Sequence, residues 1–162
     1  MQVTLARVDS RLIHGQVIEA WVPYTGATII IVANDQAYRD EFQRMVMESL
    51  ASPSIKIKII PIEWCGVEQS SRDMDMERGI FLLANLKDAW RAICSGLKID
   101  SLNIGVIHYE EGKTKLLPSV FIGREDLGYF KKIDEKGVEI ILRPLPSDRP
   151  IKLWEVLPLK VI

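Results

Sequence analysis

Short apolar runs alternate along the chain with segments whose apolar residues recur at helical spacing. The runs predict strands at residues 3–6, 27–33, 55–60, 79–84, 102–107 and 138–143, with a further extended segment at 116–122. The spacing predicts helices at residues 15–21, 36–50, 61–71, 86–96, 124–136 and 151–157. Because strands that alternate with helices form parallel sheets, the pattern predicts an α/β fold with an open, mainly parallel central sheet and helices on both faces.

The segment 36–50 is predicted to be one continuous helix. Its apolar residues recur at helical spacing and are Phe42, Met45, Val46 and Leu50. Pro53 is expected to close this helix, because proline cannot continue the backbone hydrogen bonding. The first helix, 15–21, is expected to end at Pro23 and Gly26.

Polar residues follow three of the predicted strands. The turn 7–16 follows the first strand, Asn34 and Asp35 follow the second, and Asn85 follows the fourth. In a parallel sheet the carboxyl ends of the strands meet at one edge, where ligands bind. We therefore expect these residues to share one edge, with Asn34 and Asp35 capping the next helix and bordering the site.

The composition is that of one ordinary globular domain. The 162 residues are predicted to form a single domain, 1–162, and with a net charge of −1 and no long basic run we expect no nucleic-acid partner. The start lacks the apolar core of a signal peptide, and no apolar run is long enough to span a membrane, so a cytoplasmic protein is expected. Cys65 and Cys94 lack metal-type spacing and are expected to be buried packing residues.

Candidate chemistry concentrates between residues 7 and 16. His14 lies where the first strand is expected to pass through a polar turn, Arg7 to Arg11, into a helix. A helix start offers unpaired N–H groups and partial positive charge, which favour a phosphate. Arg7 and Arg11 would bind phosphoryl oxygens, and Gly15 would let the backbone approach them closely. This set predicts phosphoryl transfer on an imidazole, with no metal and no cofactor.

The sequence leaves the orientation of the imidazole open. A neutral ring uses one nitrogen as the nucleophile, and the other needs a hydrogen-bond acceptor. Asp9 or a backbone carbonyl would supply that acceptor, and either ring nitrogen would then carry the phosphoryl group. The alternative to a functional role is a turn or cap residue for Asp9, and an ion pair with Glu19 for Arg11. The second histidine, His108, is expected to be a loop or strand residue.

Residues 7–17, RVDSRLIHGQV, closely resemble the phosphorylation-site motif of enzyme IIB components of the bacterial sugar phosphotransferase system, mannose/fructose/sorbose family. The resemblance continues at residues 31–35, 103–105 and 137–146, and so covers nearly the whole chain. It implies that His14 accepts a phosphoryl group from a IIA domain and passes it to a sugar carried by membrane IIC and IID subunits. It also implies that Arg7 and Arg11 match active-site arginines, and that Asp9 matches a carboxylate that orients them or the imidazole.

Three functions remain open on the sequence. The first is a phosphocarrier for sugar uptake that associates peripherally with its membrane subunits. The second is a regulatory relay with the same chemistry at His14 and no dedicated transporter. The third is a non-covalent anion- or nucleotide-binding module, which explains the arginines better than the histidine and lacks a glycine-rich phosphate loop. The sugar is left open, as is the choice between a homodimer and a monomer.

Overall fold

The structure, a computed structural model, describes residues 1–157, so residues 158–162 of the predicted domain lie outside the described part. Its centre is a seven-stranded sheet in the order β3-β2-β4-β1-β5-β8-β9. The strands of this sheet are β1 (Gln2–Asp9), β2 (Ile29–Ala33), β3 (Lys56–Ile60), β4 (Arg78–Leu83), β5 (Ser101–Val106), β8 (Glu139–Leu142) and β9 (Ile151–Lys152). All neighbouring pairs are parallel except β8 and β9, which confirms the predicted mainly parallel sheet.

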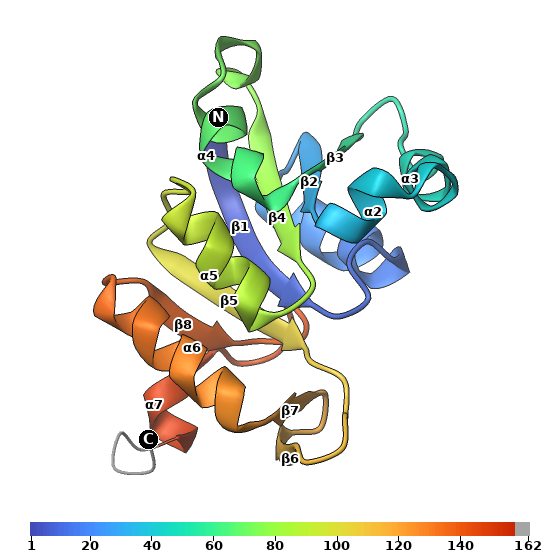
Figure 1. Cartoon of the computed structure of the whole chain (residues 1–162). Helices are drawn as coiled ribbons and strands as arrows, with labels where there is room; N and C mark the ends of the chain where they lie inside the picture. The colour runs from blue at the N-terminus through green and yellow to red at the C-terminus, as the bar shows by residue number, and fades with distance from the viewer. Residues whose placement is uncertain (158–162) are drawn as a thin grey trace.

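Helices cover both faces of the sheet. They are the helical segment after β1, made of η1 (Val17–Trp21) and α1 (Val22–Thr25), then α2 (Asp35–Arg39), α3 (Glu41–Glu48), η2 (Ile62–Trp64), α4 (Cys65–Ser70), η3 (Arg72–Met74), α5 (Leu86–Cys94), α6 (Arg124–Glu135) and α7 (Leu153–Val156). The segment after β1 and α3 share one core cluster, whereas α5 and α6 pack into the other and lie in front of the sheet in Figure 1.

The strand order explains this division. The connections from β1 to β2 and from β2 to β3 run toward one edge of the sheet, whereas those from β3 to β4, β4 to β5 and β5 to β8 run toward the other. Because crossovers between parallel strands are right-handed, connections that run in opposite directions place their helices on opposite faces. The predicted helices on both faces are thereby confirmed.

Strand β1 is longer than the sequence pattern predicts. It continues through Arg7 and Asp9, which were expected in a polar turn, and it pairs with β4 on one side and β5 on the other. Side chains alternate along a strand, so Arg7 and Asp9 lie on one face while Val8 enters the core on the other. Pairing on both sides buries these polar side chains, and a local pattern contains no information on such pairing.

The prediction of one continuous helix at residues 36–50 is wrong, because the structure has two helices there. The chain bends at Asp40, whose backbone is extended (φ −88°, ψ 101°), and α2 and α3 lie on either side of it. Asp40 ends α2 by donating its N–H to Gln36 and caps α3 by accepting from the Gln43 N–H at 3.0 Å. A short side chain that competes for backbone hydrogen bonds favours such a break.

Smaller differences concern the ends of elements. Pro23 occupies the first turn of α1, where its missing N–H costs nothing, and Gly26 ends the helix in a left-handed conformation (φ 66°). The segment 116–122 belongs to an antiparallel hairpin of β6 (Thr114–Leu117) and β7 (Val120–Ile122). The last predicted helix begins as strand β9.

Cys65 is buried, which raises its thiol pKa to about 12, but Cys94 is exposed, contrary to expectation.

Two glycines should respond in opposite ways to alanine. A Cβ at Gly66 would lie 2.5 Å from the Ser95 carbonyl oxygen, so Gly66→Ala forces α4 away from the end of α5. Nothing lies within 4 Å of a Cβ at Gly128, inside α6. We expect Gly66→Ala to lower the free energy of unfolding by about 1–3 kcal/mol. Gly128→Ala should raise it by about 0.5–1 kcal/mol, and urea unfolding measures both.

Candidate active site

His14 lies beyond the carboxyl end of β1, next to the buried carboxylate of Asp9. The Nε2 atom of His14 is 2.9 Å from Asp9 Oδ2, while the side chain is 17% exposed. An ionised carboxylate only accepts hydrogen bonds, so this contact fixes the tautomer with the proton on Nε2. Among the described residues Nδ1 has no hydrogen-bond partner, and its lone pair is available for chemistry.

Asp9 is fully buried and receives bonds from both sides. Its Oδ2 accepts from the Arg7 guanidinium at 3.1 and 3.3 Å, and its Oδ1 accepts from the Arg11 backbone N–H at 3.0 Å. Carboxylates hold such a buried position only when they are paired and hydrogen-bonded. The structure places the Asp9 carboxylate against the imidazole, and its role in orienting that ring stays a prediction.

Arg7 is itself fully buried, and its remaining donors are engaged. It donates to Asn103 Oδ1 at 2.6 Å and to the carbonyl oxygens of Arg143 and Pro144 at 3.2 and 3.1 Å. Burial lowers the pKa of its guanidinium, and the charge of Asp9 opposes that effect. The expected role of Arg7 as a direct phosphate ligand is wrong for this geometry. Its guanidinium lies behind Asp9, because the strand that carries it is paired on both sides.

Two residues on β5 make room for Arg7, and the sequence pattern alone did not single them out. Asn103 is a buried polar residue that accepts from Arg7 and donates to the Arg143 carbonyl. At Gly105 a Cβ would lie 1.9 Å from Arg7 Cζ, so glycine is required for space. A polar residue and a glycine inside an apolar strand were the available signal, because both are unusual in a strand interior.

Trp21 closes the network from the helix that follows the site. Its ring centre lies 5.2 Å from Arg7 Cζ and 5.9 Å from Arg143 Cζ, and its indole N–H donates to the Pro144 carbonyl at 3.2 Å. A guanidinium against an indole face is attracted by the ring quadrupole. The helix after His14 and the loop after β8 are thereby held on the same buried arginine.

The loop between Asp9 and His14 contains a strained residue. Leu12 has φ 57°, the left-handed region, and is buried. For a non-glycine residue this conformation costs on the order of 1–2 kcal/mol. Burial of Leu12 and Ile13 anchors the loop to the core on one side, and Ser10 anchors it on the other by accepting the His108 N–H at 3.1 Å. The loop is therefore held in one conformation, with the imidazole at its end.

Arg11 is the exposed cation of the site. Its guanidinium is 41% exposed, lies 3.5 Å from Asp9 Oδ1 and donates to Gln16 Oε1 at 3.0 Å, so the alternative pairing with Glu19 is not observed. Gly15 begins the helix, and a Cβ there would meet only Glu19 Oε1, at 4.0 Å. The surroundings of Gly15 therefore do not require a glycine at this position. That the backbone at Gly15 closely approaches a phosphate stays a prediction.

Asn34 and Asp35 lie at the same edge of the sheet, as expected, but only Asn34 caps the helix that follows, α2. Asn34 Oδ1 accepts from the Ala37 N–H at 2.9 Å. Asp35 accepts from the Ile62 N–H at 3.0 Å and from Arg91 at 2.8 Å. Burial raises the pKa of Asp35, but these bonds outweigh it and the pKa is lowered. Strand β4 separates them from β1, so they lie beside the site rather than in it.

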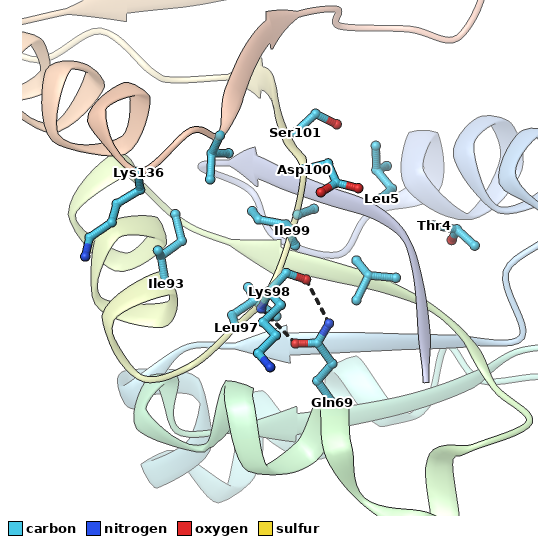
Figure 2. Close-up of a pocket in the computed structure, with 13 residues that line it drawn as sticks. Thr4, Leu5, Gln69, Ile93, Leu97, Lys98, Ile99, Asp100, Ser101 and Lys136 are labelled. Atoms are coloured by element: carbon cyan, nitrogen blue, oxygen red, sulfur yellow. Dashed lines mark hydrogen bonds between the residues drawn. The ribbon is translucent and has the colours of Figure 1, made fainter.

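A cavity lies at the opposite edge of the sheet. It has a volume of about 610 Å³ and is lined near the amino ends of β1 and β5 by Thr4, Leu5 and Ser101 (Figure 2). Gln69 closes one wall through two hydrogen bonds of 2.8 Å to the backbone of Lys98. His14 follows the carboxyl end of β1 and does not line this cavity.

Comparison with known proteins decides the family. The sequence matches the family described as PTS system sorbose subfamily IIB component over residues 3–161. The chain belongs to this family. IIB components of the phosphotransferase system (PTS) are phosphotransferases of sugar transport, and they work with IIA and with IIC/IID components. The predicted phosphoryl-transfer activity is therefore confirmed at the level of the family.

Individual relatives support the assignment. The chain is 33% identical to the sorbose-specific EIIB component of Klebsiella pneumoniae, over 96% of this chain and 94% of that protein. The crystal structure of the IIBSor domain of the sorbose permease from the same organism superposes with a TM-score of 0.88, at 32% identity, over 96% of this chain and 95% of that one. The mannose-specific EIIAB component of Escherichia coli strain K12 is 29% identical over 97% of this chain, which spans 49% of that protein.

Two properties of the described residues complete the account of the IIB fold. No helix within residues 1–157 is both long and apolar enough to cross a membrane. In the same range, no group of three or more histidine, cysteine or acidic side chains is placed to hold a metal ion.

Substitution of Gly105 tests the buried arginine network. In Gly105→Ala the new methyl group occupies the position of the Arg7 guanidinium. If the guanidinium moves away, the buried Asp9 carboxylate loses its hydrogen bonds from Arg7. We expect a loss of at least about 1–3 kcal/mol in the free energy of unfolding, measured with urea. Gly15→Ala is the matched control, since its Cβ meets only Glu19 Oε1 at 4.0 Å; equal stability of the two variants would contradict this account of Gly105.

Proposed function

We propose that this IIB chain carries the phosphoryl group on Nδ1 of His14. The group comes from a phosphohistidine of a IIA domain and leaves to a sugar bound by membrane IIC and IID subunits, with which the chain associates peripherally. The observation that supports this most strongly is the 2.9 Å contact between His14 Nε2 and Asp9 Oδ2. It assigns the proton to Nε2 and leaves Nδ1 as the nucleophile.

The chemistry balances without a metal. The lone pair of Nδ1 attacks phosphorus, a new N–P bond forms, and the N–P bond to the donor imidazole breaks, so that the donor takes back its electron pair. The His14 ring keeps its proton on Nε2 and becomes positively charged. The Asp9 carboxylate, 2.9 Å away, stabilises that charge. In the second transfer a hydroxyl oxygen of the sugar attacks phosphorus, the N–P bond to His14 breaks with its electron pair returning to Nδ1, and the hydroxyl proton passes to solvent.

The remaining residues position these groups. Arg11 is the exposed cation next to Asp9 and would bind phosphoryl oxygens, together with the unpaired N–H groups at the helix start near Gly15. Arg7 neutralises Asp9 from the buried side and keeps its carboxylate aimed at Nε2. The regulatory relay uses the same chemistry, and the presence of cognate IIC and IID components separates the two functions.

Phosphorylation of His14 is the first prediction. With phosphoenolpyruvate, enzyme I, HPr and a cognate IIA domain, the parent chain should gain one acid-labile phosphoryl group, seen by intact mass and mapped to His14. His14→Ala should gain none, because no nucleophile remains at the end of the loop. Absence of label from two IIA domains that are themselves phosphorylated would favour a non-covalent anion-binding module instead.

Replacement of Asp9 should impair transfer without removing the nucleophile. In Asp9→Asn the amide cannot stabilise the cationic ring, and we expect phosphorylation of His14 to slow by at least about 10²-fold. Imidazole nitrogen NMR gives an independent readout: the parent should show the proton on Nε2, and the variant should lose this single tautomer. A variant that keeps both the tautomer and the parent rate would exclude the proposed role of Asp9.

A further inference from the structure

Asn103 is a buried asparagine in β5 that lies beside Arg7 of β1. The two residues are register partners on neighbouring parallel strands, so their side chains lie next to each other on one face of the sheet. Gly105, two residues along the same face, leaves the space that the Arg7 guanidinium fills, because a Cβ there would lie 1.9 Å from Arg7 Cζ. Strand β5 thus provides Arg7 with a polar partner and with the space it needs.

The side-chain amide of Asn103 is held at both of its polar atoms. Its Nδ2 donates to the Arg143 carbonyl oxygen at 3.1 Å, and its Oδ1 accepts from Arg7 Nη1 at 2.6 Å. Because an amide donates at one atom and accepts at the other, the bond to Arg143 directs Oδ1 toward the guanidinium. Among the hydrogen bonds of the Arg7 side chain within residues 1–157, the one to Asn103 is the shortest. Asn103 is therefore an oriented acceptor that holds one corner of the guanidinium.

The orientation of the guanidinium determines which oxygen of Asp9 it contacts. An arginine frequently pairs with a carboxylate through two parallel bonds, one to each oxygen. In this site Arg7 Nε and Nη2 both donate to Oδ2, at 3.3 and 3.1 Å, while Nη1 is turned toward Asn103. Oδ1 is left for the Arg11 backbone N–H at 3.0 Å. The carboxylate is thereby held with Oδ2 at 2.9 Å from His14 Nε2.

The neutral charge of Asn103 is part of this arrangement. A carboxylate at position 103 would compete with Asp9 for the single positive charge of Arg7, and two buried carboxylates beside one cation would favour protonation of one of them. The amide accepts a hydrogen bond from the guanidinium without that competition. Asp9 therefore keeps Arg7 as its counter-ion and remains an acceptor for His14.

We propose that Asn103 is a positioning residue for phosphoryl transfer: by holding Arg7 Nη1, it turns the guanidinium so that Asp9 presents Oδ2 to His14 Nε2. The inference rests on the proposed function of His14 as the phosphoryl acceptor. Within residues 1–157 the Asn103 amide bonds to Arg7 and to the Arg143 carbonyl and not to the imidazole, so it acts on the reaction through Arg7 and Asp9.

A double-mutant cycle tests this chain of contacts. Phosphorylation of His14 by a phosphorylated IIA domain is measured in the parent, in Asn103→Leu, in Asp9→Asn and in the double variant. Leucine resembles asparagine in shape but has no polar atom to hold Arg7. We expect Asn103→Leu to lower kcat about 10-fold and to leave KM unchanged, because a buried residue takes no part in docking. In the Asp9→Asn background the same substitution should change kcat by less than about twofold, because the carboxylate through which Asn103 acts is gone.

Two further variants separate positioning from loss of the fold. Asn103→Ser keeps a hydroxyl and leaves room for a water molecule, so the fold should be retained and kcat should lie between those of the parent and of Asn103→Leu. The cycle is run with Asn103→Ser if Asn103→Leu does not fold. Asn85→Ala is the matched control, since Asn85 caps α5 by accepting from the Asp88 N–H at 2.8 Å. Its kcat should stay within about twofold of the parent.

Three results would overturn the inference in a parent that still labels at His14. One is a parental kcat in both Asn103 variants. Another is an equal loss of kcat from the Asn103 substitution with and without the Asp9 carboxylate, which is expected of a residue that only stabilises the fold. The third is a raised KM at unchanged kcat, which would assign Asn103 to docking. Failure of the parent to label at His14 would instead overturn the proposed function, and this inference with it.

Discussion

The site depends on one buried carboxylate. Asp9 has no exposure to water and yet accepts hydrogen bonds from Arg7, from the Arg11 backbone and from His14. Burial of an unpaired carboxylate costs several kcal/mol, so Asp9 can be ionised only because Arg7 lies against it. Arg7 in turn requires acceptors from β5 and from the segment after β8. The orientation of one exposed imidazole therefore rests on strands that are distant in sequence.

One side of the site is buried in the sheet, and the other side faces solvent. Because β1 lies between β4 and β5, the residues at its carboxyl end are enclosed, and hydrogen bonds there act in a low effective dielectric. Beyond the last residue of β1 the loop leaves the sheet, and the His14 ring and the Arg11 guanidinium are partly exposed to solvent. Under the proposed function, a charge that develops on the His14 ring would be stabilised by the buried Asp9 carboxylate, while a phosphoryl group on the ring would be on the side that faces solvent.

The position of α3 follows from the same topology. The sheet ends at β3, so a helix that packs there finds core contacts for one side only, and Met47 provides them. The opposite side has no further layer of the domain to cover it. Apolar residues on that side therefore remain exposed to solvent in this chain.

Local pattern determined much of this protein. Apolar runs located the strands, because strand length and β-branched composition are properties of a short segment. The sequence around His14 predicted that this residue, Asp9, Arg11 and a helix start lie together, and the structure has them as neighbours. The cap formed by Asn34 was predicted for the same reason, since it accepts from backbone three residues away. The contacts of Asp35 with Ile62 and Arg91 were not predicted, because they join segments that are distant in sequence.

Only the tertiary structure decided which way these residues point. Periodicity defines a face of a helix or strand but not what the face contacts, so the apolar spacing of α3 was visible in the sequence while its exposure to solvent was not. Arg7 looked like an exposed turn residue and became a buried partner of Asp9, because pairing with both β4 and β5 encloses it. The need for glycine at position 105 arises likewise from Arg7, a residue far away in the sequence. Burial is set by contacts between distant segments, and a local pattern does not contain them.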